Sequence, residues 1–309
     1  MNNQSKHYCG IDVSKKKLDI YFKGKVKQYD NTIKGIEKLA NSAKDAHYVL
    51  ESTGGYERLA AWYLMERDHE VSIINPKRVR DYAKSTGQFA KTDKIDAKMI
   101  YQYAESINPR KSLLPPASYR RLCALIDRRL QLINIRVAEL NRLDMSTDDF
   151  MIKLIEENLD QLNQQIALIE EQLKILWVDD QNLSNKISAM TKICGISIIT
   201  ALTILAHLPE IGHLNKQEAA ALAGLAPYNR DSGGFRGKRF IYGGRAKIRT
   251  ALYMPAVCAI THNPHLKIFY QRLVNENHCP SKVALTAVMR KMIVALNSSL
   301  KNPDFMLAS

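Results

Sequence analysis

The sequence predicts a mixed α/β domain, then two long paired helices, then a mainly helical C-terminal region. Three observations predict this order. Strand and helix patterns alternate over residues 7–108, apolar residues keep a heptad spacing over residues 119–176, and helical patterns return beyond them around a glycine-rich basic stretch. From these changes we place the domains at residues 1–114, 115–185 and 186–309, with Pro115-Pro116 at the first boundary.

The first region begins with three short strand patterns separated by tight turns. The predicted strands cover residues 7–13, 17–22, 25–29, 47–50 and 70–74, and the predicted helices start at residue 32 and cover about 56–67, 77–85 and 94–106. Three consecutive strands followed by alternating helices and strands is the order of the RNase H-like fold. Order alone does not prove that fold, because other α/β domains begin similarly.

The second region has apolar residues at alternating intervals of three and four. They are Tyr119, Cys123, Ile126, Leu130, Ile133, Val137 and Leu140, and then Ile152, Ile155, Leu159, Leu162, Ile166, Ile169, Leu173 and Leu176. This spacing is typical of a coiled-coil seam, and the polar break at residues 146–149 permits a hairpin. The seam can pair within the chain or between chains. The alternative is two amphipathic helices packed on a globular core.

The third region carries helical patterns on both sides of a glycine-rich stretch. We expect helices over residues 192–208, 217–223, from 246 onward, and over 282–300. Residues 191–208, centred on Gly195, are reminiscent of a helix-hairpin-helix that grips a DNA backbone. A buried helix pair is an equal alternative.

The charge balance favours a polyanionic partner. Lys and Arg number 45 against 31 Asp and Glu, a net charge of +14, and such an excess suits binding to nucleic acid. The alternatives are a basic protein without such a partner and, less favoured, an anionic membrane. Five scattered cysteines without a CxxC pair indicate a reducing compartment and no zinc knuckle. We find no apolar run of about 18 residues, so no membrane span is expected.

Four acidic residues occupy positions that suit a metal site. Asp12 and Glu51 each end a predicted buried strand, and Asp93 and Asp96 are three apart on one helix face. In an RNase H-like sheet the two strands are neighbours, so their acidic ends meet. Grouped carboxylates repel one another unless a cation neutralises them, and Mg²⁺ prefers oxygen ligands. The alternative is that Asp12 is a turn residue and that Asp93 interacts with a helix dipole behind a Thr92 cap.

The glycine-rich stretch, residues 224–249, suits phosphate binding. Its cationic side chains, our candidate nucleic-acid contacts, are Arg230, Arg236, Lys238, Arg239, Arg245, Lys247 and Arg249. Glycines let the backbone approach a ligand closely. Ser232 lies among them and is either a nucleophile beside a phosphodiester or a turn residue with Gly233.

These motifs together resemble a known family. GIDVSK around Asp12, ESTGGYE from Glu51 and KTDKIDA around Asp93 and Asp96 resemble blocks of the DEDD-type transposases of insertion sequences. More narrowly, the chain resembles the one-hundred-ten family, whose N-terminal domain is RuvC-like. The stretch LAGLAPYNRDSGGFRGKRFIYGGRAKIRTALY is similar to that family's C-terminal domain, so the resemblance covers nearly the whole chain.

The resemblance implies a recombinase that excises and inserts a mobile element. It implies Mg²⁺, with Mn²⁺ as a substitute, held by Asp12, Glu51, Asp93 and Asp96, and a serine nucleophile at the position of Ser232 that forms a covalent DNA intermediate. It implies donor and target DNA chosen by a non-coding bridge RNA. It further implies a composite site between protomers, coiled-coil dimers assembling to a tetramer, and a cytoplasmic, nucleoid-associated bacterial protein without a membrane partner.

Three other functions stay open at this point. A junction-resolving nuclease of the RuvC type would use the carboxylates and water without a covalent intermediate. A non-catalytic nucleic-acid scaffold would need no metal. A sugar-kinase-like phosphotransferase shares an early GID strand, but we find no second glycine-rich phosphate loop.

Overall fold

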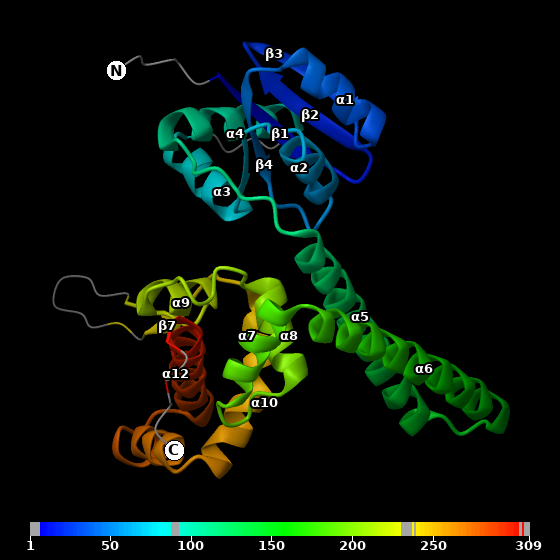
Figure 1. Cartoon of the computed structure of the whole chain (residues 1–309), viewed down its shortest axis with the longest axis vertical. Coiled ribbons are helices and arrows are strands. Elements are labelled where there is room, and N and C mark those ends of the chain that lie inside the picture. Colours follow the sequence, from blue (N-terminus) through cyan, green and yellow to red (C-terminus); the bar gives the residue numbers. More distant parts are fainter. Residues whose placement is uncertain (1–6, 88–92, 230–236, 238, 303–304, 306–309) are drawn as a thin grey trace. The chain divides into compact units, whose positions relative to one another are not determined.

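The computed structural model describes residues 7–87, 93–229, 237, 239–302 and 305. The chain divides into two compact units, one up to Pro115 and one from Pro116 onward (Figure 1). The helical hairpin and the C-terminal region that we expected as separate domains lie in the second unit and share part of one core.

The first unit is built on a five-stranded mixed sheet. Its strands are β1 (His7–Val13), β2 (Lys17–Phe22), β3 (Lys25–Asp30), β4 (Ala46–Glu51) and β5 (Val71–Ile74), in the spatial order β3-β2-β1-β4-β5. The first three strands pair antiparallel, whereas β4 pairs parallel with both β1 and β5. The predicted chain order of three strands followed by alternating helices and strands is confirmed, and β1 and β4 are neighbours as an RNase H-like sheet requires.

Helices cover both faces of this sheet. Helices α1 (Ile33–Ser42) and α2 (Glu57–Met65) lie on one face, and α3 (Pro76–Ser85) and α4 (Asp93–Ile107) lie on the other (Figure 1). The sequence sets the starts of two of them. The Thr32 hydroxyl accepts the Gly35 N–H at the start of α1, and the Asn75 side chain accepts the Lys77 N–H at the start of α3. The helices on each face cover a separate apolar core.

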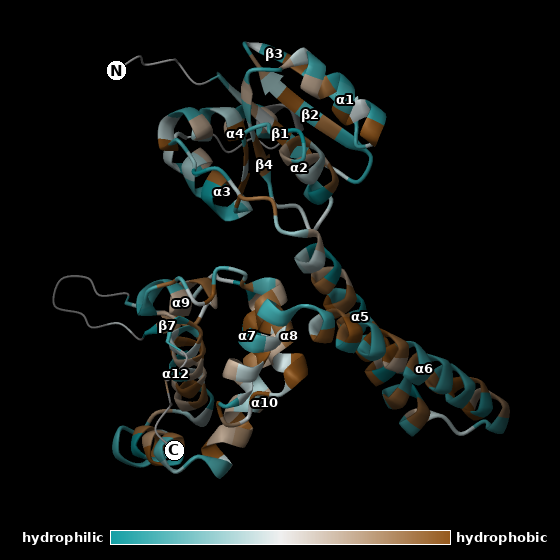
Figure 2. Cartoon of the chain, in the orientation of Figure 1, coloured by the Kyte–Doolittle hydropathy of each residue, from teal (hydrophilic) through white to brown (hydrophobic). Residues whose placement is uncertain are grey.

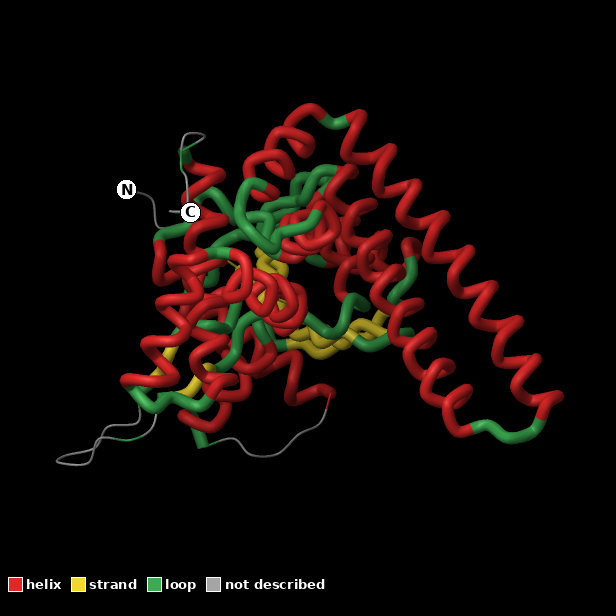
Figure 3. Tube along the Cα trace, turned by 90° about the horizontal axis from the view of Figure 1, so that it is seen from below, coloured by secondary structure: helices red, strands yellow, loops and turns green. Residues whose placement is uncertain are grey.

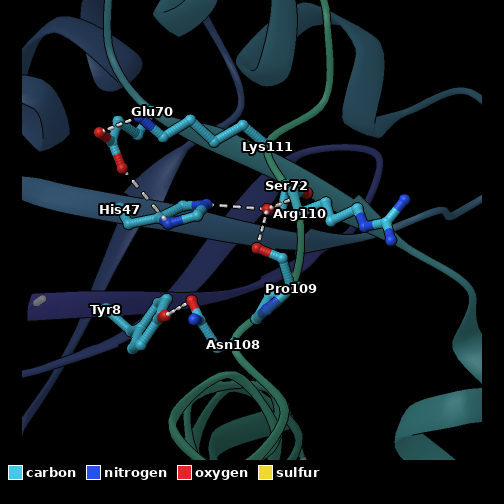
Figure 4. Close-up of polar contacts among 8 residues, drawn as sticks. All are labelled: Tyr8, His47, Glu70, Ser72, Asn108, Pro109, Arg110 and Lys111. Atoms are coloured by element: carbon cyan, nitrogen blue, oxygen red, sulfur yellow. Dashed lines mark hydrogen bonds and ion pairs between the residues drawn. The ribbon is translucent and has the colours of Figure 1, made fainter.

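The segment after α4 is fixed to the edge of the sheet (Figure 4). The Ser72 hydroxyl donates to the Arg110 carbonyl oxygen at 2.8 Å and lies 2.8 Å from His47 Nε2. Because the hydroxyl hydrogen is used in that bond, His47 Nε2 carries the proton that it shares with Ser72. The Ser112 N–H donates to Val71 O at 2.7 Å. These bonds hold the chain against β5 up to the last residues of the first unit.

The second unit begins with two long helices that form a hairpin. Helices α5 (Ala117–Met145) and α6 (Asp149–Asp179) lie side by side (Figures 1 and 3), with an apolar stripe along each (Figure 2). The Asp148 side chain caps α6 by accepting the Met151 N–H at 3.0 Å. Five residues of the predicted α6 seam are buried, namely Ile155, Leu159, Leu162, Ile166 and Leu173. The coiled coil itself stays a prediction.

The predicted seam of α5 holds at Ile133, which packs against α6, but not beyond it. Val137 and Leu140 are 47% and 44% exposed, whereas Leu132, outside the predicted seam, is 1% exposed and packs against α6. The reason is that α5 has two partners. The first half of α5 packs into the C-terminal core through Leu122 and Ile126. The second half packs against α6 through Leu132. A single heptad stripe cannot serve both surfaces.

The remainder of the second unit is a helical domain around one large core. It consists of α7 (Gln181–Thr191), α8 (Ile198–His207), α9 (Lys216–Leu222), α10 (Ala246–His262), α11 (Pro264–Gln271), a π-helical turn (Arg272–Glu276) and α12 (Ser281–Lys301), with a two-stranded ribbon of β6 (Pro227–Tyr228) and β7 (Phe240–Ile241). The mainly helical character is confirmed.

The helix expected over residues 192–208 starts later than predicted. Gly195 adopts a φ of +85°, which ends helical geometry, and α8 begins only at Ile198, where Ser197 provides the N-cap. A Cβ atom at residue 195 would lie 2.4 Å from the Pro255 carbonyl oxygen. The turn between α7 and α8 therefore packs on α10, which favours the buried helix pair over a DNA-gripping hairpin.

Helix α12 is long and apolar enough to cross a membrane by length and composition alone. However, 56% of its most apolar window is buried inside the protein, and Arg290 and Lys291 lie in its middle. Its apolar residues belong to the core of the second unit. These features identify α12 as a core helix.

Candidate active site

Asp12 and Glu51 lie at the ends of two neighbouring parallel strands. The register of β1 and β4 pairs Gly10 with Val49 and Ile11 with Leu50, and the next step aligns Asp12 with Glu51. Both acidic residues are half-buried. Because side chains alternate along a strand, Asp12 and Glu51 point to the same face as Gly10 and Val49.

That face is the one covered by α3 and α4. Tyr8 and Val49 belong to the core beneath these helices, whereas Ile11 and Leu50 belong to the opposite core beneath α1 and α2. The sheet thus directs the Asp12 carboxylate toward the face on which α4 lies.

Helix α4 runs antiparallel to β1. The Tyr8 hydroxyl donates to Asn108 Oδ1 at 2.6 Å, just beyond the end of α4. Two residues further along β1, a Cβ atom at Gly10 would lie 2.4 Å from Ala97 O, near the start of the helix. The next residue on this face, Asp12, therefore lies toward the first turn of α4. That turn contains Asp93 and Asp96.

The first turn of α4 is only partly described. Asp96 is half-buried, and the side chain of Asp93 lies outside the described part of the chain. Among the residues whose side chains are described, no group of three or more His, Cys, Asp or Glu side chains is arranged to hold a metal ion. Asp12 and Glu51 are thus the two predicted residues that strand pairing places side by side, and their oxygen donors fit a hard divalent cation.

A further carboxylate lies beside Asp12. The antiparallel register of β1 and β2 places Asp19 directly opposite Asp12, so both side chains are on the α4 face. Asp19 is 7% exposed and accepts a hydrogen bond from Gln28 Nε2 at 2.8 Å. The face that carries Asp12 is therefore more acidic than the four predicted residues indicate.

The loop that follows Glu51 is held by a second glutamate of the ESTGGYE motif. Glu57 is buried, and its carboxylate accepts the N–H groups of Thr53 and Gly55, each at 2.9 Å. Gly54 and Gly55 adopt φ values of +64° and +107°, which glycine tolerates without steric cost. This motif thus contains one predicted site residue, Glu51, and one residue that shapes the loop after it, Glu57.

Asn31 joins the two loops that follow the acidic strands. Its Nδ2 donates to the Ser14 carbonyl oxygen at 3.0 Å and to the Tyr56 carbonyl oxygen at 3.1 Å. Ser14 comes two residues after Asp12, and Tyr56 comes five residues after Glu51. The Asn31 side chain therefore fixes the separation of these loops.

The predicted basic and nucleophilic residues of the second unit are described only in part. Ser232, Arg230, Arg236 and Lys238 lie outside the described residues. Arg239 is exposed just before β7. The nucleophilic role of Ser232 therefore stays a prediction.

Three of the predicted cationic residues make contacts inside the protein. Arg245 forms two 2.7 Å bonds to the Glu210 carboxylate, and its Nη1 also donates to the His207 carbonyl oxygen at 2.9 Å. Lys247 pairs with Asp127, and Arg249 Nη1 donates to the Gly243 carbonyl oxygen at 2.6 Å. These contacts hold the base of the glycine-rich stretch in place, so binding nucleic acid would be an additional role for these residues.

Comparison with known proteins identifies the family. One transposase model, of the DEDD type of IS110, matches residues 3–150, and a second, the transposase IS116/IS110/IS902 family, matches residues 188–271. The chain belongs to the IS110 family of transposases. Relatives of this IS110-type enzyme include the pilin gene-inverting proteins of Moraxella bovis and Moraxella lacunata. Each is 28% identical over 307 residues, which cover 94% of both chains.

The family match gives the geometry its chemical setting. This IS110-type protein is a DNA transposase or recombinase, and its substrate is DNA. Its N-terminal unit has the RNase H-like fold that the DEDD match implies, with a mixed five-stranded sheet.

The sequence of this IS110-type enzyme did not lead us to single out three residues near the candidate site, Asp19, Asn31 and Glu57. Glu57 was visible as the last residue of ESTGGYE, but nothing marked it as a loop-holding carboxylate. Asp19 would have emerged from pairing the first two strands across their turn. Asn31 carries no local signal, because its partners are backbone oxygens 17 and 25 residues away.

Proposed function

We propose that this enzyme cuts and rejoins DNA of a mobile element with Mg²⁺ held by Asp12, Glu51, Asp93 and Asp96 and with Ser232 as the nucleophile. A non-coding bridge RNA would choose donor and target DNA, and Mn²⁺ would substitute for Mg²⁺. The family match supports the recombinase reaction and a divalent metal. The metal identity, the serine and the RNA are our proposal.

The observation that carries the metal proposal is the common face of Asp12 and Glu51. Two carboxylates at adjacent strand ends, on the face crossed by α4, create a negative potential that a divalent cation would neutralise. The bound cation would offset charge on the attacked phosphate. Asn31 and Glu57 would keep the two strand-end loops in a fixed geometry, which limits how far the carboxylates separate when the cation is absent.

The covalent step balances in a simple way. The Ser232 Oγ forms a bond to the DNA phosphorus, one backbone P–O bond breaks, and the released strand end takes up a proton as a hydroxyl. In the rejoining step a strand-end hydroxyl attacks the phosphoserine, and Ser232 recovers its proton. The number of phosphodiester bonds is conserved, so no external energy source is needed. Free serine is a poor nucleophile, so the step requires activation by the carboxylate site or by the surrounding positive charge.

Assembly would proceed through the helical hairpin. Apolar side chains stay exposed near its tip, among them Met145 at 84% and Phe150 at 68%. We propose that these surfaces pair two chains, and that dimers assemble further to a tetramer in which serine and carboxylates from different protomers meet. The net charge of +14 supports simultaneous binding of DNA and RNA.

The alternative is a RuvC-type junction-resolving nuclease, in which the same carboxylates activate water. One observation favours it: Asp12 and Glu51 lie at adjacent strand ends of an RNase H-like sheet, and a cation held by such carboxylates can activate water without a serine. This alternative predicts cleaved DNA without any covalent protein–DNA species.

A strand-exchange assay separates the two. It would use labelled DNA from the segments that flank the gene, together with the adjacent non-coding RNA, and resolve the products on a denaturing gel. We expect a covalent adduct from the unaltered enzyme, none from Ser232→Ala or Asp12→Ala, and an unchanged adduct from the control Ser188→Ala on an exposed face of α7. An adduct that persists in Ser232→Ala would overturn the nucleophile, and cleavage without an adduct in the unaltered enzyme would establish the nuclease.

A further inference from the structure

The ribbon at the base of the glycine-rich stretch carries three aromatic rings that contact one another. Tyr228 comes from β6, Phe240 from β7, and Tyr242 follows β7 directly. The ring centroids of Tyr228 and Phe240 are 6.4 Å apart, and the Tyr242 centroid lies 6.3 Å from each. The three rings thus form a compact triangle on a ribbon of only two paired residues per strand.

Two of the three rings are exposed, and the third, Phe240, is half-buried. Tyr228 is 43% and Tyr242 is 49% exposed, and Ile241 between the latter and Phe240 is 40% exposed. Tyr242 stands nearly perpendicular to both other rings, with interplanar angles of 86° and 75°. In tilted and edge-to-face contacts one ring does not cover the face of another as it does in parallel stacking, and Tyr228 and Tyr242 keep large exposed fractions. None of the three belongs to the buried core of the second unit.

The ribbon is held rigidly where it leaves the body. Gly224 and Gly244 are so close that a Cβ atom at residue 244 would lie 2.1 Å from the Gly224 nitrogen, and the Arg245 N–H donates to the Leu222 carbonyl oxygen at 2.8 Å. Arg249 Nη1 also donates to the Gly243 carbonyl oxygen at this point, the neck of the ribbon around Gly224 and Gly244. A surface that is already ordered loses little conformational entropy when it binds a ligand.

The charge around the rings suits a nucleic-acid strand. Arg239 is exposed beside Phe240, and the half-buried Arg249 lies at the neck, whereas no acidic side chain occurs among the described residues from Leu225 to Arg249. Aromatic faces with adjacent cations are typical of surfaces that bind single strands, because each base stacks on a ring while a cation meets the backbone phosphate. In a duplex the base faces are covered by their neighbours, so a ring can stack only on an unpaired base.

We propose that Tyr228, Phe240 and Tyr242 form a stacking platform for unpaired bases of the DNA strand being exchanged. Joining DNA strands to new partners requires bases that have left their original pairs, and the platform would hold such bases. The proposal rests on the DNA recombinase activity of the family and is independent of the carboxylate site and of the serine.

The test compares variants that keep the apolar bulk with variants that keep the ring. The double variant Tyr228→Leu/Tyr242→Leu removes two aromatic rings, whereas Tyr228→Phe/Tyr242→Phe retains both. Tyr253→Leu alters a 44% exposed tyrosine on α10 and serves as the control. Binding of an oligodeoxythymidine with 2-aminopurine at alternate positions is followed by fluorescence, because stacking on an aromatic ring quenches 2-aminopurine. The same strand annealed to its complement is the duplex control.

We expect quenching by the unaltered enzyme, by the phenylalanine pair and by Tyr253→Leu. The leucine pair should lose the quenching and bind the single strand about tenfold more weakly, with duplex binding unchanged. A leucine pair that binds and quenches like the unaltered enzyme would overturn the proposal, as would an equal loss for duplex. Absence of quenching in the unaltered enzyme would do the same without any variant. An effect confined to an oligoribonucleotide of the same bases would overturn the assignment to DNA.

Discussion

Gly10 on β1 and Ala97 on α4 approach so closely that a Cβ atom at residue 10 would lie 2.4 Å from the Ala97 carbonyl oxygen and 2.5 Å from the Tyr101 nitrogen. Both of these obstacles are backbone atoms, which cannot rotate away as a flexible side chain can. The glycine in GIDVSK is thus the residue that lets α4 lie directly on the strand that carries Asp12.

Gly10→Ala should therefore push α4 off the sheet. Overpacking of this kind costs about 1–3 kcal/mol, and we expect a corresponding fall in the free energy of unfolding in urea. Strand cleavage should fall much further, because the first turn of α4 would move away from Asp12. Gly24→Asn is the control, since residue 24 has open space around it and a φ of +78° that asparagine also adopts. Equal activity of both variants would contradict the role of the close approach.

Asn31→Ala should raise the concentration of Mg²⁺ that gives half-maximal cleavage by several-fold. Two hydrogen bonds between the strand-end loops are lost, each worth about 1 kcal/mol, so Asp12 and Glu51 would no longer be held at a fixed separation. Saturating Mg²⁺ should restore most of the rate. Asn41→Ala, on the exposed side of α1, serves as the control. If Asn31→Ala lowered only the unfolding temperature, Asn31 would have a purely structural role.

Asp19→Asn should raise the stability of the metal-free protein and reduce the additional stability that Mg²⁺ confers. Like charges directly opposite on neighbouring strands repel, and asparagine retains an oxygen that accepts the Gln28 hydrogen bond. We expect the unfolding temperature in a chelator to rise, and the further increase produced by Mg²⁺ to shrink. A variant that melts lower in both conditions by the same amount would show that the Asp19 charge has no link to the cation.

Asp127→Asn should destabilise the second unit at neutral pH. Burial raises the pKa of Asp127, but hydrogen bonds and charges from His207 and Lys247 outweigh it and lower that pKa to about 2. A carboxylate with a lowered pKa contributes stability above its unfolded pKa, and this contribution disappears as the pH falls from about 4 to about 2. The shift corresponds to about 2 kcal/mol near neutrality.

Unfolding in urea at a series of pH values checks this expectation. The difference in stability between the unaltered protein and Asp127→Asn should be largest near pH 7 and disappear near pH 2. Asp160→Asn, on the exposed face of α6, should behave like the unaltered protein throughout. A difference that is independent of pH would mean that the Asp127 charge is not what His207 and Lys247 stabilise.

Much of the fold and part of the site could be predicted because their signals are local. Strand patterns located β1 and β4, and the parallel pairing of those strands brings the acidic residues at their ends next to each other as a candidate site. The heptad spacing predicted α6 well, because one face of that helix is buried along its length. It did not describe α5 beyond Ile133, since that helix changes partners midway.

What could not be predicted depends on partners distant in the sequence. Asp19 joins the acidic face only through strand register, and Asn31 acts through carbonyl oxygens on two other loops. Arg245 and Lys247 looked like free cations in a basic stretch, yet Glu210 and Asp127 engage them from 35 and 120 residues away. Residue spacing in the sequence does not predict such distant pairs.

Binding of Mn²⁺, followed by electron paramagnetic resonance, tests the central claim that Asp12 and Glu51 hold a divalent cation. The unaltered protein should bind the ion, and Asp12→Asn and Glu51→Gln should each bind at least about tenfold more weakly while their circular dichroism is unchanged, since each removes a charged ligand. Asp45→Asn, exposed at the opposite end of β4, should bind like the unaltered protein. Unchanged Mn²⁺ affinity in Asp12→Asn and Glu51→Gln would contradict the claim.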